Sequence, residues 1–181
     1  MKQTLVNVAL YEAGWIAAIM LASHGRFGWA AAVPLALTVV HVALSRQPGR
    51  ELGLVVAAGL VGCGEDTLMI ALRAYAPRGS GVLVALPSLW LIALWVQLAT
   101  LVRFSLRWLA GHRLMAGLLG ALGGPVAVLV GVQMGAAAFP HGAAHAVLLL
   151  APAWALATPA LFALGKALGG GELEGEYRFA R

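Results

Sequence analysis

Long apolar runs alternate with short polar breaks along the whole chain. A transmembrane helix needs about 17–25 predominantly apolar residues, and most of the runs reach that length. They are continuously apolar, whereas β-barrel strands would alternate polar and apolar residues, so they predict helices. The pattern predicts an all-α polytopic membrane helix bundle, one domain over residues 1–168 with six transmembrane helices. The predicted spans lie at about residues 5–23, 29–44, 52–72, 81–102, 114–139 and 143–164.

The composition supports this fold class. Of the 181 residues, 61% are hydrophobic and 10% are charged. A soluble domain has about 25% charged and 45–50% apolar residues, so a water-soluble fold is excluded and membrane lipids are the expected surroundings. The formal net charge is +5. Because the basic residues lie between the apolar runs and not along one stripe, they indicate membrane topology and not a nucleic-acid partner.

Basic residues also predict the orientation of the bundle. Six spans place both termini on the same side of the membrane, and Lys and Arg concentrate on the cytoplasmic side. Nine basic residues fall on the terminal side and three on the other, which predicts cytoplasmic N and C termini. The terminal side has Lys2, Arg46, Arg50, Arg103, Arg107, Arg113, Lys166, Arg178 and Arg181, and the other side has Arg26, Arg73 and Arg78.

The C-terminal segment, residues 169–181, has no apolar face. Three glycines precede Glu172, Glu174 and Glu176. Glycine-rich segments behave as flexible linkers, so we expect a flexible, solvated cytoplasmic tail.

Small residues predict where helices pack closely, because membrane helices approach one another at glycine. The fifth span has the pairs Gly120/Gly124 and Gly131/Gly135, and the third span has Gly59 four residues before Cys63. We therefore expect the third and fifth spans to be central in the bundle.

Polar residues inside the spans are the candidate functional residues, because an ionisable group in hydrocarbon is costly. At the terminal side, Glu12, His41 and Gln97 are expected to form an inner polar cluster, with Arg103 and Arg107 on one face nearby. This cluster is either a set of interhelical hydrogen bonds or a site for a substrate headgroup or a proton. The two arginines either extend to lipid phosphates or bind an anionic substrate.

A second polar group lies in the opposite half of the membrane. Glu65 and Asp66 are in the third span, and Arg73 follows Asp66 by seven residues, so an ion pair between those two is one interpretation. His141 and His145 are four residues apart and could join Asp66 or Glu65 as ligands of a divalent metal ion. The spacing is weak evidence, and no metal is favoured. No motif for a nucleotide or another cofactor is present, so no cofactor is expected.

Several segments resemble a known family. They are LYEAGW in the first span, Arg50-Glu51-Leu52 before the third, PSLWLIALWVQLATLVRFSLRWL around the fourth, and LLGALGGP with Gly131 and Gly135-Ala136 in the fifth. Together these segments resemble small bacterial inner-membrane proteins that are grouped as a domain of unknown function. The resemblance implies a helix bundle in the bacterial inner membrane and favours a lipid-like substrate, without an established activity.

Three functions are compatible with these patterns. The first is binding or handling of a lipid-like or small hydrophobic substrate at an intramembrane polar site formed by the inner cluster. The second is a small proton- or cation-coupled transporter that uses Glu65 and Asp66. The third is a non-catalytic subunit that packs on a membrane partner, or on a second copy, through the glycine faces of the fifth span. The sequence assigns no reaction.

Overall fold

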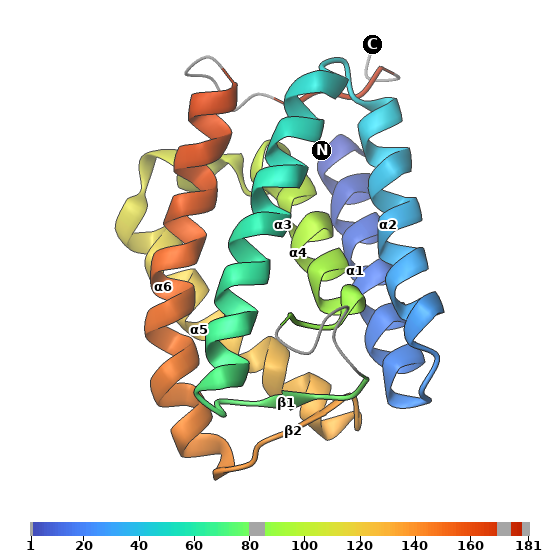
Figure 1. Cartoon of the computed structure of the whole chain (residues 1–181). Coiled ribbons are helices and arrows are strands. Elements are labelled where there is room, and N and C mark those ends of the chain that lie inside the picture. Colours follow the sequence, from blue (N-terminus) through green and yellow to red (C-terminus); the bar gives the residue numbers. More distant parts are fainter. Residues whose placement is uncertain (1, 80–85, 170–174, 179–181) are drawn as a thin grey trace.

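The computed structural model describes residues 2–79, 86–169 and 175–178, and these residues form a bundle of helices (Figure 1). Five of the helices are long and apolar enough to cross a membrane, and α4 is a shorter apolar helix. The predicted all-α polytopic membrane bundle is therefore confirmed. Its α-helices are α1 (Lys2–Ser23), α2 (Phe27–Leu44), α3 (Pro48–Ala71), α4 (Leu89–Val102), α5 (Arg113–Gln133) and α6 (Gly142–Leu168).

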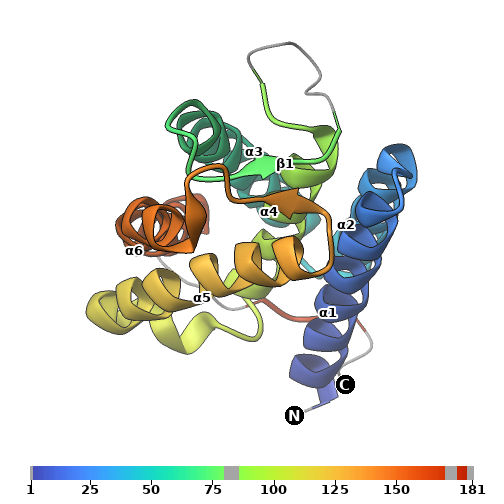
Figure 2. The ribbon, with the colours of Figure 1, turned by 90° about the horizontal axis from the view of Figure 1, so that it is seen from below.

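The centre of the bundle is α4, which packs against α1, α2, α3 and α6 (Figure 2). It begins at Leu89, whereas the sequence predicted a span from residue 81, and residues 80–85 lie outside the described part of the chain. Pro87 explains the late start, because proline disfavours the helical conformation in the residue before it. With 14 residues, α4 is about 21 Å long, shorter than the hydrocarbon core. A short helix is tolerated here because neighbouring helices surround it.

The end of α5 also differs from the predicted span, which continued to residue 139. The helix ends at Gln133 because Gly135 has a φ of +80°, a left-handed conformation that reverses the chain. The amide of Gly135 donates to Val132 O and that of Ala136 donates to Gly131 O. This pair of hydrogen bonds is the Schellman motif, a common helix end.

A two-stranded connection joins the ends of the helices opposite the termini. Strand β1 (Ala76–Pro77) pairs antiparallel with β2 (Ala137–Ala138), so the connection after α3 contacts the connection after α5 (Figure 1). Arg78 follows β1 and its Nη1 donates to Ser23 O at 2.8 Å and to Gly135 O at 3.4 Å. These carbonyls lie at the ends of α1 and α5, where the helix dipole favours a cation. Arg78 thus links α1 to α5.

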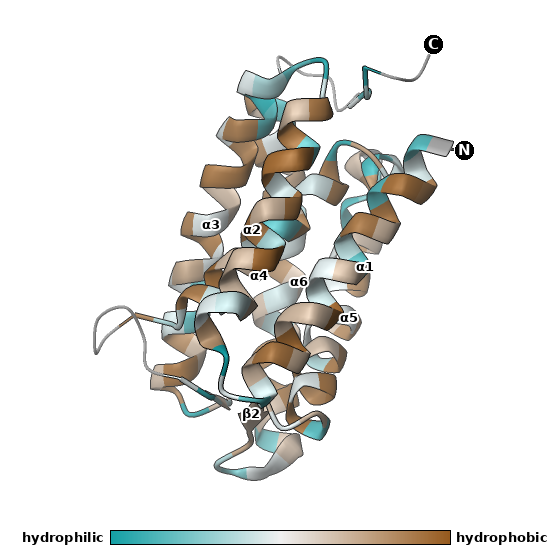
Figure 3. Cartoon of the chain, turned by 90° about the vertical axis from the view of Figure 1, so that its right-hand side faces the viewer, coloured by the Kyte–Doolittle hydropathy of each residue, from teal (hydrophilic) through white to brown (hydrophobic). Residues whose placement is uncertain are grey.

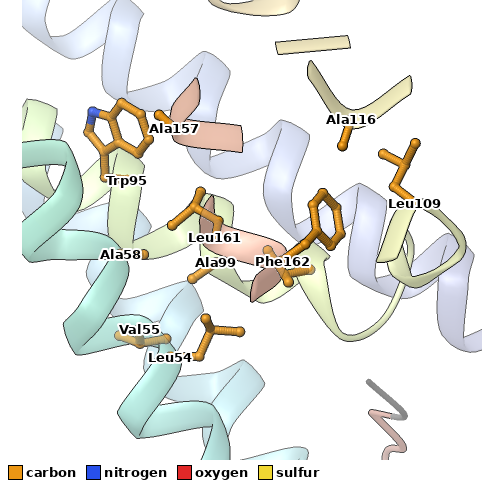
Figure 4. Close-up of a cluster of buried hydrophobic side chains, with 11 residues drawn as sticks. Leu54, Val55, Ala58, Trp95, Ala99, Leu109, Ala116, Ala157, Leu161 and Phe162 are labelled. Carbon is orange, nitrogen blue, oxygen red and sulfur yellow. The ribbon is translucent and has the colours of Figure 1, made fainter. Parts of the chain in front are cut away.

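The largest buried cluster lies where α3, α4 and α6 meet (Figure 4). Leu54 and Ala58 from α3 pack there with Trp95 and Ala99 from α4 and with Leu161 from α6. Alanine at two of these five positions brings the helices close together, as small residues do in membrane bundles.

The outer surface of the bundle is apolar. Leu60, Leu114, Leu148 and Leu156 are each more than 70% exposed, and hydrophobic residues cover much of the helices' length (Figure 3). A soluble monomer rarely exposes apolar patches larger than a few hundred Å². Such a surface is typical of a helix bundle that crosses a membrane.

Glycines of α5 pack against α6, which is the main neighbour of α5. A Cβ atom added at Gly120 would lie 2.3 Å from Trp154 O, and one at Gly124 would lie 2.1 Å from Trp154 Cγ. The close packing predicted for this glycine pair is present, but α5 lies at the side of the bundle and not at its centre. No atom lies within 4 Å of a Cβ placed at Gly131, so the second predicted pair makes no such contact.

The described part of the C-terminal segment, residues 175–178, is packed against the bundle. Tyr177 is fully buried. Backbone hydrogen bonds connect Arg46 N to Glu176 O and Arg178 N to Leu44 O. The expected flexible, solvated tail is therefore wrong for these four residues, because Tyr177 supplies an aromatic ring that the bundle buries. Glu172 and Glu174 lie outside the described residues.

Candidate functional site

A buried ion pair lies at the terminal end of the bundle. Arg103, the residue that follows α4, donates from Nη1 to Glu51 Oε1 at 2.8 Å, and both side chains are 1% exposed. Arg103 Nη2 also donates to Gln47 Oε1 at 2.7 Å. Glu51 lies in the first turn of α3, where the helix dipole stabilises a carboxylate. The guanidinium and the carboxylate balance each other's charge, so the pair is tolerated in the interior.

His41 connects this ion pair to the C-terminal segment. Its Nε2 lies 3.5 Å from Glu51 Oε2, and its Nδ1 lies 2.8 Å from the Tyr177 hydroxyl. Asn7 Nδ2 donates to that hydroxyl oxygen at 3.3 Å and to Thr100 O at 3.0 Å. The Tyr177 proton then points to His41 Nδ1, which leaves the hydrogen of a neutral imidazole on Nε2, toward Glu51. Five elements, α1, α2, α3, α4 and the C-terminal segment, thus meet in one network.

Burial limits what this network can do. His41, Glu51, Asn7 and Tyr177 are all at most 1% exposed, so a ligand cannot touch them in this conformation. Burial raises the pKa of the Tyr177 hydroxyl above its ordinary value, and the nearby Glu51 carboxylate adds to the rise. The network therefore holds neighbouring residues in place, above all Arg103.

An arginine-lined pocket of about 540 Å³ lies beside the network, at the same end of the bundle. Arg46 forms an ion pair with Glu176, and Arg103 is held by Glu51. Arg50 donates to the neutral Gln47 side chain, and Arg107 is exposed. Among the described residues, Arg50 and Arg107 have no carboxylate within ion-pair distance. The lining residues are Gln3, Thr4, Arg46, Gln47, Arg50, Arg103, Phe104, Arg107, Gly175 and Glu176.

A second polar centre lies near the opposite end, on α3. Asp66 is 5% exposed and accepts hydrogen bonds from the Tyr75 hydroxyl at 2.5 Å and from Trp95 Nε1 at 3.1 Å. Burial raises the pKa of Tyr75, which lies in the connection after α3, well above its ordinary value, and the charge of Asp66 adds to the rise. Asp66 lies at the wall of a pocket of about 80 Å³ between α1, α4 and α5.

Comparison with known proteins places the chain in a family. A family model described as a protein of unknown function, DUF2878, matches residues 4–160. The chain belongs to the DUF2878 family. No curated protein and no solved structure matches it. The resemblance to a family of unknown function is therefore confirmed.

In this DUF2878 protein the inner cluster is only partly the predicted one. His41 and Arg103 are brought together, with Glu51 between them. Gln97 instead donates to Leu10 O on α1 at 3.0 Å. Glu12 lies on the exposed face of α1 and, within the described part of the chain, makes no hydrogen bond or ion pair. The structure thus does not bring Glu12 to His41 or Gln97.

The predicted outer group is also rearranged in the DUF2878 fold. Arg73 is exposed, and Asp66 is bound by Tyr75 and Trp95 instead. Both carboxylate oxygens of Glu65 are buried, and neither has a hydrogen-bond donor among the described residues. The proposed ion pair between Asp66 and Arg73 is absent because the chain turns back at Arg73, which has a φ of +56°.

The histidine pair does not form a three-ligand site. The ring centroids of His141 and His145 are 5.2 Å apart, and His145 Nε2 lies 3.2 Å from Leu72 O. Asp66 is engaged elsewhere. In the part of the chain that the structure describes, no group of three His, Cys, Asp or Glu residues is placed to hold a metal ion.

Sequence reasoning missed several residues of the DUF2878 polar network. Glu51 precedes the predicted start of the third span by one residue and was not among the candidate site residues. Pro48, at the start of α3, is the signal that would have moved the helix start upstream and placed Glu51 in its first turn. Tyr177 was assigned to a solvated tail, and no local pattern marks it as buried.

Proposed function

We propose that this protein is a bacterial inner-membrane protein with cytoplasmic termini that binds the anionic headgroup of a lipid-like molecule in the arginine-lined pocket. The ligand group is a phosphate or a carboxylate. The observation that supports the proposal is the excess of positive charge in that pocket. The lining has four arginines. Among the described residues, Glu176 and Glu51 compensate two of them, and no carboxylate pairs with Arg50 or Arg107.

Arginine suits this ligand class. The guanidinium presents paired N–H donors that match two oxygens of a phosphate or carboxylate. Arg103 is fixed in the pocket wall by Glu51 and Gln47, while Arg50 and Arg107 are exposed to an incoming ligand. A rigid wall with two accessible cations is an arrangement that favours an anion over a neutral group.

The position of the pocket supports a lipid-like ligand over a free anion. The pocket lies at the end of a bundle whose outer surface is apolar, which is the level where lipid headgroups gather. A molecule with an acyl chain can keep its chain against the exposed leucines while its headgroup enters the pocket.

Charge distribution supports the proposed orientation. Among the described residues, basic side chains at the pocket end outnumber those at the opposite end, as the positive-inside rule requires for a cytoplasmic end. At the pocket end these are Arg46, Arg50, Arg103, Arg107, Arg113, Lys166 and Arg178, and at the opposite end Arg26, Arg73 and Arg78.

The test is binding of three probes to the purified protein in detergent: dihexanoyl phosphatidic acid, inorganic phosphate and dihexanoyl phosphatidylcholine. We expect phosphatidic acid to bind most tightly. Arg50→Gln and Arg107→Gln should each weaken its binding by about tenfold, since a hydrogen bond to a charged group contributes about 1.5–3 kcal/mol. Calorimetric titration measures the effect.

The matched control is Arg113→Gln. Arg113 is an exposed arginine at the same end of the bundle and is not among the pocket residues, so its substitution should leave the affinity unchanged. Equal losses from all three variants, or equal binding of phosphatidylcholine, would contradict the proposal. If inorganic phosphate bound as tightly as phosphatidic acid, the pocket would be an anion site, but the proposal of a lipid-like ligand would be contradicted.

A further inference from the structure

The pocket beside Asp66 is unusually rich in aromatic side chains. Four of the chain's six tryptophans line it, together with two of its three tyrosines. They come from α1, α4, α6 and the connection after α3, so the fold gathers them from distant parts of the sequence. The aromatic lining residues are Tyr11, Trp15, Tyr75, Trp90, Trp95 and Trp154.

Charge in this pocket has one sign. Asp66 is the one ionisable carboxylate among the described lining residues, and none of them is Lys, Arg or His. Tyr75 and Trp95 each donate one hydrogen bond to Asp66, one to each oxygen. A carboxylate oxygen has two lone pairs, so each of these two donors leaves one lone pair on its oxygen, and the adjacent Glu65 side chain also interacts with Asp66.

We propose that this pocket binds the ammonium head of a small organic cation, such as an alkylated amine, between its aromatic rings and the Asp66 carboxylate. Aromatic rings attract cations through the negative charge of their faces, and tryptophan does so most strongly. A carboxylate at the wall supplies the opposite charge. A lining of this composition repels anions, and a neutral molecule gains less binding free energy from it than a cation does.

The size of the pocket sets the size of the group that enters. Its volume of about 80 Å³ is roughly half that of a 150 Å³ cavity that holds benzene. It therefore accommodates a head of a few heavy atoms, while the rest of a larger amine stays between α1 and α5. At Gly131, on the α5 side of the pocket, no atom lies within 4 Å of an added Cβ, which leaves room for that remainder.

This site is separate from the arginine-lined pocket and does not rest on the function proposed above. Asp66 follows Glu51 by fifteen residues on the same helix, a separation of about 22 Å along its axis. The two pockets also have opposite charge, so one ligand head cannot serve both.

The experiment compares choline with 3,3-dimethylbutan-1-ol, a neutral molecule of nearly the same shape in which carbon replaces the nitrogen. Tryptophan fluorescence of the purified full chain reports binding, because four tryptophans line the pocket. We expect choline to quench or shift the emission at concentrations at least tenfold lower than the neutral alcohol, since the cation gains both the ring and the carboxylate interactions.

Two variants and one control locate the effect. Asp66→Asn keeps the shape and removes the charge, and Trp15→Leu, on the half-buried wall of α1, removes one ring without touching Asp66; each should weaken choline binding by on the order of tenfold. Glu12→Gln removes an exposed carboxylate of α1 outside the pocket and should change nothing. Equal binding of choline and the alcohol, or unchanged affinity in Trp15→Leu, would overturn the proposal even if Asp66→Asn failed to fold.

Discussion

Arg73 occupies the position at the end of α3 where a helix most often has glycine. Its φ is +56°, and it is the one residue other than glycine with a positive φ among the described residues. The amide of Arg73 donates to Ile70 O and that of Ala74 donates to Met69 O, the same Schellman arrangement that ends α5 at Gly135. The exposed arginine therefore adopts a backbone conformation that is unfavourable for residues with a Cβ atom.

Replacing Arg73 by glycine should stabilise the protein. Glycine adopts this conformation without the steric penalty, which is about 1 kcal/mol. The expected result is a rise in the midpoint of thermal unfolding in detergent. Arg73→Ala is the matched control, because it removes the same side chain but keeps the Cβ, and it should give no gain. Equal midpoints for the glycine and alanine variants would show that the backbone conformation has no such effect.

The same residue shows why the sequence predicted the wrong partner for Asp66. Seven residues of continuous helix would place Arg73 on nearly the same face as Asp66. The helix ends at Ala71, however, and the reversal at Arg73 returns Tyr75 to the carboxylate. The helix end depends on the positive φ angle of Arg73. An arginine in the sequence does not predict such an angle, whereas a glycine would.

At the scale of elements, the contact between α5 and α6 depends on individual glycines. Gly120 has the Trp154 carbonyl oxygen and the Thr158 hydroxyl within 2.3 Å of an added Cβ. Gly123 lies on the same helix, is exposed, and would meet no atom within 4 Å. Gly120 and Gly123 therefore lie on the same helix but differ in how closely they are packed, so they form a matched pair.

Alanine at these two positions should have opposite effects on stability. Gly120→Ala forces α6 away from α5 and should destabilise the protein by about 1–3 kcal/mol, the usual range for an overpacked contact. Gly123→Ala should be neutral or stabilise by up to about 1 kcal/mol, because alanine favours the helix. Unfolding of both variants in increasing sodium dodecyl sulfate measures the difference. Similar gains in both variants would mean that helix propensity and not packing decides, and similar losses would contradict the assignment of Gly123 to an open face.

The helices themselves were predictable, but the order in which they pack was not. Every span is apolar, and in a membrane protein an apolar face meets lipid as readily as it meets another helix. Glycine content favoured the third and fifth spans as central, yet α4 is central and carries no glycine between Leu89 and Val102. Its buried residues include Trp90, Ala93, Trp95 and Ala99, and Gly62 of α3 makes room for the ring of Trp95.

At the scale of the whole molecule, the C-terminal segment, residues 175–178, binds both to the start of α1 and to the end of α4. Tyr177 N donates to Gln3 Oε1, and Gly175 N donates to Arg103 O. The start of α1 and residues 175–178 consequently lie at the same end of the bundle (Figure 1). Because the Tyr177 ring also packs on His41 and Phe104, the segment covers the buried polar network.

This contact predicts a dependence of stability on alkaline pH. Burial raises the pKa of Tyr177 in the folded protein above its value in the unfolded chain. Its contribution to stability is complete below about pH 10, the ordinary pKa of tyrosine, and is lost as the pH rises through the folded-state pKa. The midpoint of unfolding should fall over this range, and Tyr177→Phe should show a smaller fall. An identical pH profile for the variant would contradict the assignment.

Part of the candidate site was predictable from the sequence, namely the residues that lie within or beside the apolar runs. His41 and Arg103 were identified because they are polar residues at the inner ends of apolar runs. Glu51, which joins them, lies just before the predicted third span, and Tyr177, which covers them, lies in the segment that composition classifies as a tail. A glutamate beside an arginine in a loop is ordinary; only the fold brings it into contact with a histidine ten residues earlier and an arginine 52 residues later.

The contacts of Tyr177 can form only late in the synthesis of the chain. This residue follows His41 by 136 positions and Asn7 by 170, so all six helices are synthesised before the hydroxyl reaches its partners. Until then, a buried histidine and a buried asparagine lack a partner that the finished fold gives them. A chain that stops before this tyrosine therefore keeps all six helices but leaves these polar groups without that partner at one end of the bundle.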